Sequence, residues 1–344
     1  MAEPVVREFG PLSAQGARVD RALRSAWSPL VRNWRFTRRG VVWAQKVFEP
    51  RGPIPVVRGT EITHTRIEHM PAEWVTAPRA QGSSPERAVL YIHGGGYVFG
   101  SPRTHRNVVS RISHVTSTRV LAIDYRLPPE HWPPAPTHDA MLAYRHLLAS
   151  GIPAEGITVA GDSAGGGISL ELVLHLAETG LPMPGALILL SPWGDLSMSG
   201  ESVTFNSGKD PFIPEGPVRK LAEVVVGPRD AADWRLSPVF GPDELFAAFP
   251  PTLLQVGSNE LIYSDSVRVA DRLAALDVEC ELQVFEGHPH VIPVWGTPES
   301  RISLKEIGEW VARHVPAEIA PAEPTDAAVE EAAEVPTPPE QTLL

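Results

Sequence analysis

Two short segments hold the residues whose chemistry is easiest to recognise. In "GDSAG", residues 161–165, a serine stands between small residues, after an apolar run and before a segment with helical spacing. In that setting the pattern G-x-S-x-G is typical of a nucleophile elbow, a sharp turn that presents a hydroxyl at the end of a strand. We therefore predict that Ser163 is the nucleophile of an acyl transfer.

The second segment is "HGGG", residues 93–96, which directly follows another apolar run. Three glycines are costly to order, and they fit either a flexible turn or backbone N–H groups that must approach an anionic oxygen. The elbow elsewhere in the chain favours the second interpretation, because the two loops together form an oxyanion hole. We assign Gly95, Gly96 and Ala164 as its donors. His93 precedes the turn, so we expect it to shape the loop rather than to act as a base.

The elements that position these loops follow from short apolar runs between turn signals. Such lengths are typical of buried strands, and the longer segments between them have helical spacing. Alternating strands and helices imply parallel strands with right-handed crossovers. We therefore predict an α/β three-layer sandwich with a mostly parallel eight-stranded sheet, in which "TRIEH" and "EWVTAP" add antiparallel edge strands. The six apolar runs are residues 88–93, 119–125, 157–161, 186–192, 252–257 and 281–287.

Two regions do not fit this alternation, and we expect both to belong to a helical cap. Residues 1–55 combine an apolar helical stripe with several arginines, and Ser28-Pro29 is expected to divide them into two helices. Such a basic amphipathic segment suits a membrane surface or the protein's own domain, and its modest apolar stripe favours the second. Residues 197–237 are too long for an ordinary crossover, and an insertion of that size is commonly a lid.

Composition restricts the number of domains, the cellular location and the kinds of partner that we expect. The 344 residues are 43% hydrophobic, enough for one large domain, and contain a single cysteine, Cys280, which we expect to pack inside a strand. Without a disulfide, a signal peptide or a long apolar run, we expect a cytoplasmic protein with no stable membrane insertion and no nucleic-acid partner. The net charge of −11 is misleading, because seven acidic residues and no Lys or Arg lie from Ala317 onward. That acidic Pro/Ala-rich tail, residues 317–344, is expected to be disordered, which leaves residues 56–316 for the catalytic domain.

The pairing of "HGGG" with "GDSAG", together with "DYRLPPEHWPPAP" and "LSPWGDLSMSGES", resembles the hormone-sensitive-lipase-like family of bacterial carboxylesterases. The resemblance runs from about residue 55 to residue 314. It implies an α/β-hydrolase fold, catalysis without metal or organic cofactor, a small-molecule ester as substrate, and it allows a homodimer.

The resemblance also implies the other two members of a catalytic triad. The family's late acid matches Glu260 in "VGSNELIYSD", where most members carry aspartate, and Asp265 is the rival acid, which we expect to cap the next helix. The family's histidine matches His290 in "GHPH". The alternative is that "HPH", with His288, is a plain loop or a metal pair, but no carboxylate or cysteine cluster accompanies it.

The resulting hypothesis is a serine carboxylesterase that cleaves short- to medium-chain esters through an acyl-enzyme. Tyr97 and Trp193 are predicted to contact substrate, with simple packing as the alternative. Asp162 could suggest an acidic probe of the substrate, but the resemblance implies that it holds the elbow by packing and hydrogen bonding. A lactone or amide hydrolase with the same triad remains open. A non-catalytic small-ligand receptor on the same fold is a more distant alternative, disfavoured because His290 is present.

Overall fold

The computed structural model describes residues 3–34 and 37–319. The segment predicted to be a disordered tail lies outside the described residues from residue 320 onward. A single large sheet runs through the molecule, and the strands of its centre are buried along their whole length.

The sheet has nine strands in the order β1-β9-β8-β7-β6-β4-β5-β3-β2. All neighbouring pairs are parallel except β2–β3 and β3–β5, which are antiparallel, as expected for the two edge segments. Each of the six apolar runs forms a strand. The strands are β1 (Val5–Phe9), β2 (Glu61–Ile67), β3 (Met70–Thr76), β4 (Ala88–Ile92), β5 (Val120–Ile123), β6 (Ile157–Asp162), β7 (Ala186–Leu190), β8 (Thr252–Gly257) and β9 (Cys280–Phe285).

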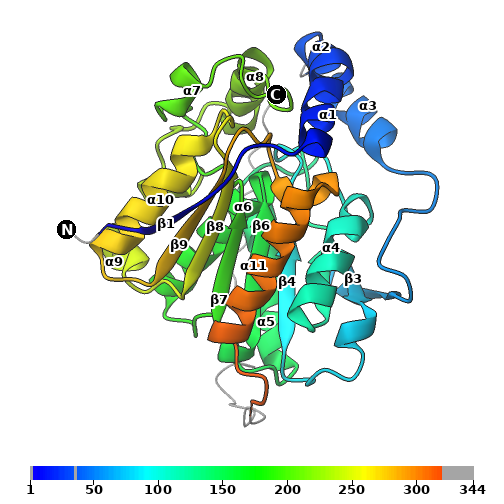
Figure 1. Ribbon diagram of the computed structural model, residues 1–344. Coiled ribbons are helices and arrows are strands. Elements are labelled where there is room, and N and C mark those ends of the chain that lie inside the picture. Colours follow the sequence, from blue (N-terminus) through cyan, green and yellow to red (C-terminus); the bar gives the residue numbers. More distant parts are fainter. Residues whose placement is uncertain (1–2, 35–36, 320–344) are drawn as a thin grey trace.

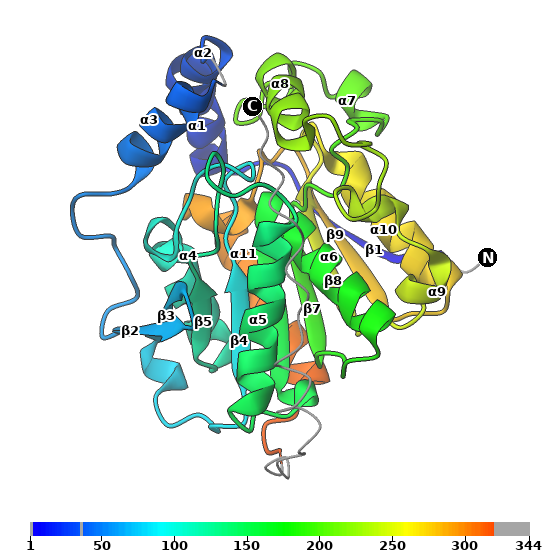
Figure 2. The same ribbon diagram turned by 180° about the vertical axis from the view of Figure 1, so that it is seen from behind.

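Helices cover both faces of the sheet and complete the three layers. Along β4, Val89 and Tyr91 belong to the core beneath α4 and α11 (Figure 1), whereas Leu90 and Ile92 face the core beneath α5, α6 and α10 (Figure 2). This alternation is the two-residue period of a strand that is buried on both sides. The helices are α4 (Pro102–Thr116), α5 (Ala135–Ala149), α6 (Ala164–Thr179), α9 (Asp243–Phe246), α10 (Tyr263–Ala275) and α11 (Pro298–His314).

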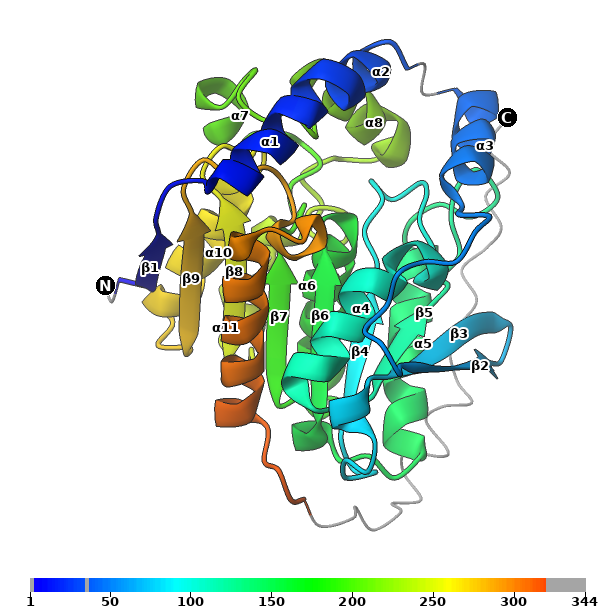
Figure 3. The same cartoon turned by 45° about the vertical axis from the view of Figure 1, so that its right-hand side comes forward.

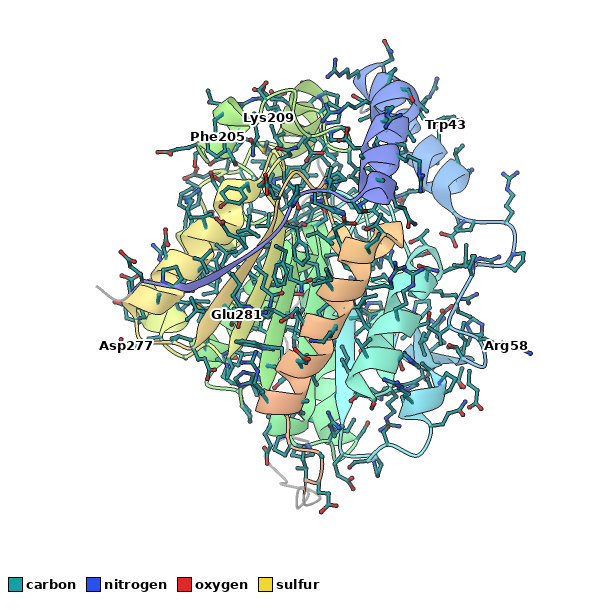
Figure 4. The ribbon with its side chains drawn as sticks, in the orientation of Figure 1. Trp43, Arg58, Phe205, Lys209, Asp277 and Glu281 are labelled. Atoms are coloured by element: carbon teal, nitrogen blue, oxygen red, sulfur yellow. The ribbon has the colours of Figure 1, made fainter. Side chains whose placement is uncertain are left out.

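The prediction of eight strands was wrong, because β1 adds a ninth at the edge of the sheet. This strand lies within the segment expected to be helical and pairs in parallel with β9. Phe9 stacks on Phe285 at 4.6 Å between ring centroids, and the Arg7 guanidinium donates to Glu281, which Figure 4 labels on β9. Its signal is weak because the strand is short and Val5 is exposed.

The expected division at Ser28-Pro29 was also wrong. Helix α1 (Ala14–Ala22) continues through a π-helical turn, η1 (Leu23–Trp27), into α2 (Ser28–Arg32), and Ser28 itself has helical dihedrals. The π turn lets the Ser28 amide bond to the Leu23 carbonyl five residues back, directly before a proline that has no N–H to donate. The next helix, α3 (Arg38–Phe48), begins after Thr37, whose side chain accepts a hydrogen bond from the Gly40 amide.

The N-terminal helices and the 197–237 insertion lie together over the carboxyl edge of the sheet (Figure 3). The insertion contains α7 (Ser202–Phe205) and α8 (Glu215–Val226). Figure 4 labels three side chains of this outer layer, Trp43 on α3 and Phe205 and Lys209 in the insertion. Within the described ranges, no helix combines the length and the apolar character needed to cross a membrane.

Candidate active site

The elbow forms where β6 ends and α6 begins. Ser163 lies between them with φ 52° and ψ −122°, a backbone conformation that few residues with a side chain adopt. The turn is tight enough that a Cβ at Gly165 would lie 2.1 Å from the Ile92 carbonyl oxygen. The small residues of "GDSAG" therefore allow the turn to pack against the end of β4 while the serine stays at the carboxyl edge of the sheet.

Two loops from the same edge bring an imidazole and a carboxylate to this serine. The Ser163 Oγ lies 2.8 Å from His290 Nε2, and His290 Nδ1 lies 2.7 Å from Glu260 Oε2. Glu260 follows β8 and His290 follows β9, so both arrive from strands that are neighbours in the sheet. The Trp295 Nε1 donates to the His290 carbonyl at 2.9 Å and restrains the histidine loop. The arrangement can pass a proton from hydroxyl to imidazole.

A residue that the sequence analysis missed, Ser191, holds the acid. The Glu260 Oε1 accepts hydrogen bonds from the Gly257 amide at 2.6 Å and from the Ser191 hydroxyl at 2.7 Å. The Ser191 oxygen in turn accepts from the Val291 amide at 3.0 Å, next to the histidine. One hydroxyl therefore connects the acid loop with the histidine loop. Sequence alone offers no signal for it, since serine after a strand is an ordinary residue.

Asp265 lies elsewhere and does not cap its helix. Helix α10 begins at Tyr263, so Asp265 is already inside its first turn. Its buried carboxylate accepts from the amides of Gly194 and Asp195, at 2.9 and 3.0 Å, and so fastens the loop after β7. The expectation of a cap was wrong because the N-cap position is Ile262, three residues before Asp265.

The triple-glycine loop faces the same serine. Gly95 and Gly96 have φ of 129° and 60°, and both line a cavity together with Ser163 and His290. Ala164, the third predicted donor, is the first residue of α6, where backbone amides are free of intrahelical partners. The loop is joined to the elbow by the Gly94 amide, which donates to Asp162 Oδ1 at 3.0 Å.

His93 and the other singled-out side chains lie apart from the serine–imidazole–carboxylate chain. The His93 Nδ1 lies 2.8 Å from the Gly94 carbonyl, and the Tyr125 hydroxyl donates to the His93 carbonyl. His288 is buried, with Nδ1 3.0 Å from the Pro289 carbonyl. Burial raises the pKa of the Cys280 thiol to about 11, so this side chain stays neutral inside β9.

Charges around the imidazole set its basicity. Burial is the largest influence and disfavours the charged form of His290, but the Glu260 carboxylate together with the charges of Asp210 and Asp162 outweighs it, so the pKa of His290 is raised above its ordinary value. A further carboxylate, Asp210 of the insertion, accepts from the Phe212 amide at 2.8 Å and the Leu261 amide at 3.2 Å. Burial raises the pKa of Asp210 to about 6.

A mostly apolar cavity of about 390 Å³ opens onto the serine. Trp193, one of the two residues predicted to contact substrate, lines it, but Tyr97, the other, is not among its lining residues. The Tyr97 ring is buried, and its hydroxyl donates to the Trp193 carbonyl at 2.8 Å. The N-terminal helices and the insertion also line the cavity, with side chains the sequence analysis did not single out for the site; these are Trp27, Val31, Trp34, Phe212, Ile213, Val218 and Leu221.

Phe212 connects this covering layer with the imidazole. Its ring is nearly parallel to that of His290, with 5.9 Å between centroids, and to that of Trp27, at 5.2 Å. The Trp27 Nε1 also donates to the Phe212 carbonyl at 2.8 Å. The N-terminal helix therefore holds an insertion residue against the imidazole.

Comparison with known proteins gives consistent matches. A family profile described as "alpha/beta hydrolase fold" matches residues 89–294. An acetyl-hydrolase of Streptomyces hygroscopicus is 35% identical over 289 residues, which are 81% of this chain and 92% of that relative. The carboxylesterase/phospholipase LipF of Mycobacterium tuberculosis is 32% identical over 74% of this chain and 69% of that protein.

Solved structures agree with these relatives. An esterase from the bacterial hormone-sensitive lipase family superposes with a TM-score of 0.77 at 32% identity, covering 89% of this chain and all of that one. The esterase EstE5, soaked with p-nitrophenyl butyrate, has a TM-score of 0.80 at 31% identity, covering 88% of this chain and 99% of that one.

Proposed function

The chain belongs to the hormone-sensitive-lipase-like esterases of the α/β-hydrolase fold and is a carboxylic ester hydrolase, and from that premise we propose a serine mechanism with Ser163, His290 and Glu260 as its catalytic triad. The observation that carries the proposal is the pair of contacts from Ser163 Oγ to His290 Nε2, 2.8 Å, and from His290 Nδ1 to Glu260 Oε2, 2.7 Å.

In this mechanism the Ser163 oxygen attacks the ester carbonyl while His290 takes its proton. The negative charge that develops on the carbonyl oxygen is met by the backbone amides of Gly95, Gly96 and Ala164. The imidazolium then gives its proton to the departing alcohol, which leaves an acyl-enzyme. A water molecule, activated by the same imidazole, attacks the acyl carbon and releases the acid. Throughout, Glu260 keeps the Nδ1 proton in place and stabilises the imidazolium.

We propose short- to medium-chain esters as substrates. A cavity of about 390 Å³ with mostly aromatic and aliphatic walls suits an acyl chain of modest length. Soaking of EstE5 with p-nitrophenyl butyrate and the name acetyl-hydrolase for a relative support the same size class. Residues 1–55 and 197–237 act as the cap that closes the cavity around the chain, with 56–316 as the catalytic domain.

The test is the variant Ser163→Ala, compared with the exposed Ser150→Ala as a matched control. We expect S163A to lose hydrolysis of p-nitrophenyl butyrate and labelling by a fluorophosphonate, and S150A to keep both. Turnover retained by S163A would remove the serine mechanism. A panel of esters from acetate to palmitate, with lactones and anilides included, then tests the proposed substrate class against the lactone and amide alternatives.

A further inference from the structure

Another imidazole, largely buried, lies near the nucleophile and has no part in the mechanism above. His105, on α4, lines the cavity, and its Nε2 is 3.5 Å from Oδ2 of Asp162, the residue that directly precedes Ser163. Both side chains are largely buried, with 16% and 5% of their surfaces exposed. A buried carboxylate next to the reacting hydroxyl needs a partner, since an unpaired buried charge is costly.

Hydrogen-bond partners determine which His105 nitrogens carry protons. The Thr104 hydroxyl lies 2.7 Å from the Ser101 carbonyl, which can only accept, so the single hydroxyl proton is used there. The Thr104 oxygen is also 2.7 Å from His105 Nδ1, and with its own proton on Ser101 it accepts from Nδ1. His105 Nε2 faces a carboxylate oxygen at 3.5 Å, where an N–H is favourable and a lone pair is not. A ring protonated on both nitrogens, an imidazolium, satisfies both contacts.

The other carboxylate oxygen of Asp162, Oδ1, accepts two hydrogen bonds, and these favour the negatively charged form of Asp162. Asp162 Oδ1 accepts from the Gly94 amide at 3.0 Å and from the Tyr91 hydroxyl at 2.7 Å. Two donors on one oxygen favour the ionised carboxylate over the acid. The bond to Gly94 joins the first glycine of the oxyanion loop to the elbow. The carboxylate thus fixes the two halves of the oxyanion hole relative to each other.

The groups that face His105 agree with a positive ring. From the N-terminal segment, the Glu49 carboxylate accepts from the Ser101 hydroxyl at 2.8 Å, and its charge also favours the protonated form of His105. The His93 ring stacks on it at 5.4 Å, and burial together with the His105 charge lowers the pKa of His93 to about 3, which keeps that ring neutral. Burial is the largest influence and lowers the pKa of His105, but the charge and hydrogen bond of Asp162, the Ser101 carbonyl and the Glu49 charge together outweigh it, so that pKa is raised.

We propose that His105 is a positioning residue for ester hydrolysis: as an imidazolium it keeps Asp162 ionised, and through Asp162 it holds the triple-glycine loop against the nucleophile elbow. This inference rests on the proposed serine mechanism and adds to it a second ion pair, which acts on the oxyanion hole and not on the Ser163–His290 proton transfer. Loss of the pair leaves a buried carboxylate uncompensated and releases Gly94.

The first test compares His105→Gln, the double variant His105→Gln/Asp162→Asn and, as a control, the exposed His64→Gln. We expect H105Q to lower kcat by about 10- to 100-fold, as for the partial loss of an oxyanion donor, with a smaller change in KM. The double variant should recover most of that loss, because an asparagine oxygen still accepts from Gly94 and Tyr91 and needs no counter-charge. H64Q should behave as the wild type. Wild-type kcat in H105Q, or no recovery in the double variant, would overturn the proposal.

The second test uses the unmodified protein, so it requires neither a folded variant nor an activity measurement. In ¹⁵N-histidine NMR of the unmodified protein at pH 7, His105 should have both ring nitrogens protonated and should lose a proton only above its ordinary pKa. A neutral His105 ring at pH 7 would overturn the proposal even if H105Q fails to fold. Retained activity in S163A would instead refute the serine mechanism, so the two failures remain distinguishable.

Discussion

Replacing Gly95 with alanine tests whether the triple-glycine loop works through its backbone. A Cβ at this position would lie 1.9 Å from the Phe99 carbonyl oxygen, whereas real Cβ atoms essentially never come closer than 3.0 Å. The loop cannot easily give way, because the Gly95 carbonyl accepts from the amides of both Val98 and Phe99 at 3.1 Å. The glycine φ of 129° adds strain for any residue with a side chain.

The loop must therefore shift by roughly 1 Å, and a misplacement of that size at a reacting centre can cost about 10²-fold in rate. Full loss of one donor costs about 10²- to 10³-fold in kcat, or roughly 3 to 4 kcal/mol of transition-state stabilisation. For p-nitrophenyl butyrate we expect G95A to lose kcat by a factor in this range, as measured by steady-state kinetics. A fluorophosphonate should still label Ser163 in this variant, but more slowly.

Gly82→Ala is the matched control, since Gly82 has φ of 81° but no atom within 4 Å of an added Cβ. The G82A variant should lose about 1 kcal/mol of unfolding free energy through similar backbone strain. Its new Cβ clashes with no other atom, and the position lies outside the site. The variant should keep the wild-type kcat. Wild-type kcat in a folded G95A enzyme would refute the assignment of Gly95 as an oxyanion donor.

Two further predictions concern the base. Glu260→Gln should lower kcat by about 10⁴-fold, because the amide no longer holds the required imidazole tautomer; steady-state rates at saturating ester measure this loss, and a small effect would point to another acid. Because His290 must be neutral to accept the serine proton, kcat/KM should fall with decreasing pH through the raised pKa of His290, so the inflection should lie above pH 6.5. A pH profile of kcat/KM checks this, and an inflection below 6.5 would contradict it.

Local patterns were sufficient to predict most of the sheet, and they also marked the two loops that we propose as the oxyanion hole. Apolar runs such as Ala88–Ile92 and Thr252–Gly257 are short, bounded by turn signals and buried on both faces, so each strand is evident within its own few residues. The elbow at Ser163 and the glycines before Tyr97 are likewise evident within a few residues. A turn with no room for side chains needs several small residues close together in the sequence. Glu260 and His290 were reached only through resemblance to a family.

The features that were missed depend on partners far away in the chain. Strand β1 pairs with residues some 275 positions later, and Val5 is 59% exposed, so nothing within the strand marks it as part of the sheet. Ser28-Pro29 looked like a helix start because the π turn that accommodates the proline has no composition of its own. Phe212 seemed an ordinary residue of an insertion until its ring was found against His290.

By itself the sequence determined the chemistry available to this protein: a serine on a tight turn, bare backbone amides after a neighbouring strand, and strands long enough to hold both. The side chains that support that chemistry become evident in the folded chain alone, from the Ser191 hydroxyl on Glu260 to the His105 ring beside Asp162. The difference lies in how far along the chain each kind of interaction acts. Turn and strand propensities act over a few residues, whereas hydrogen bonds, ring stacking and charge pairing act between whichever groups the fold brings within a few ångströms.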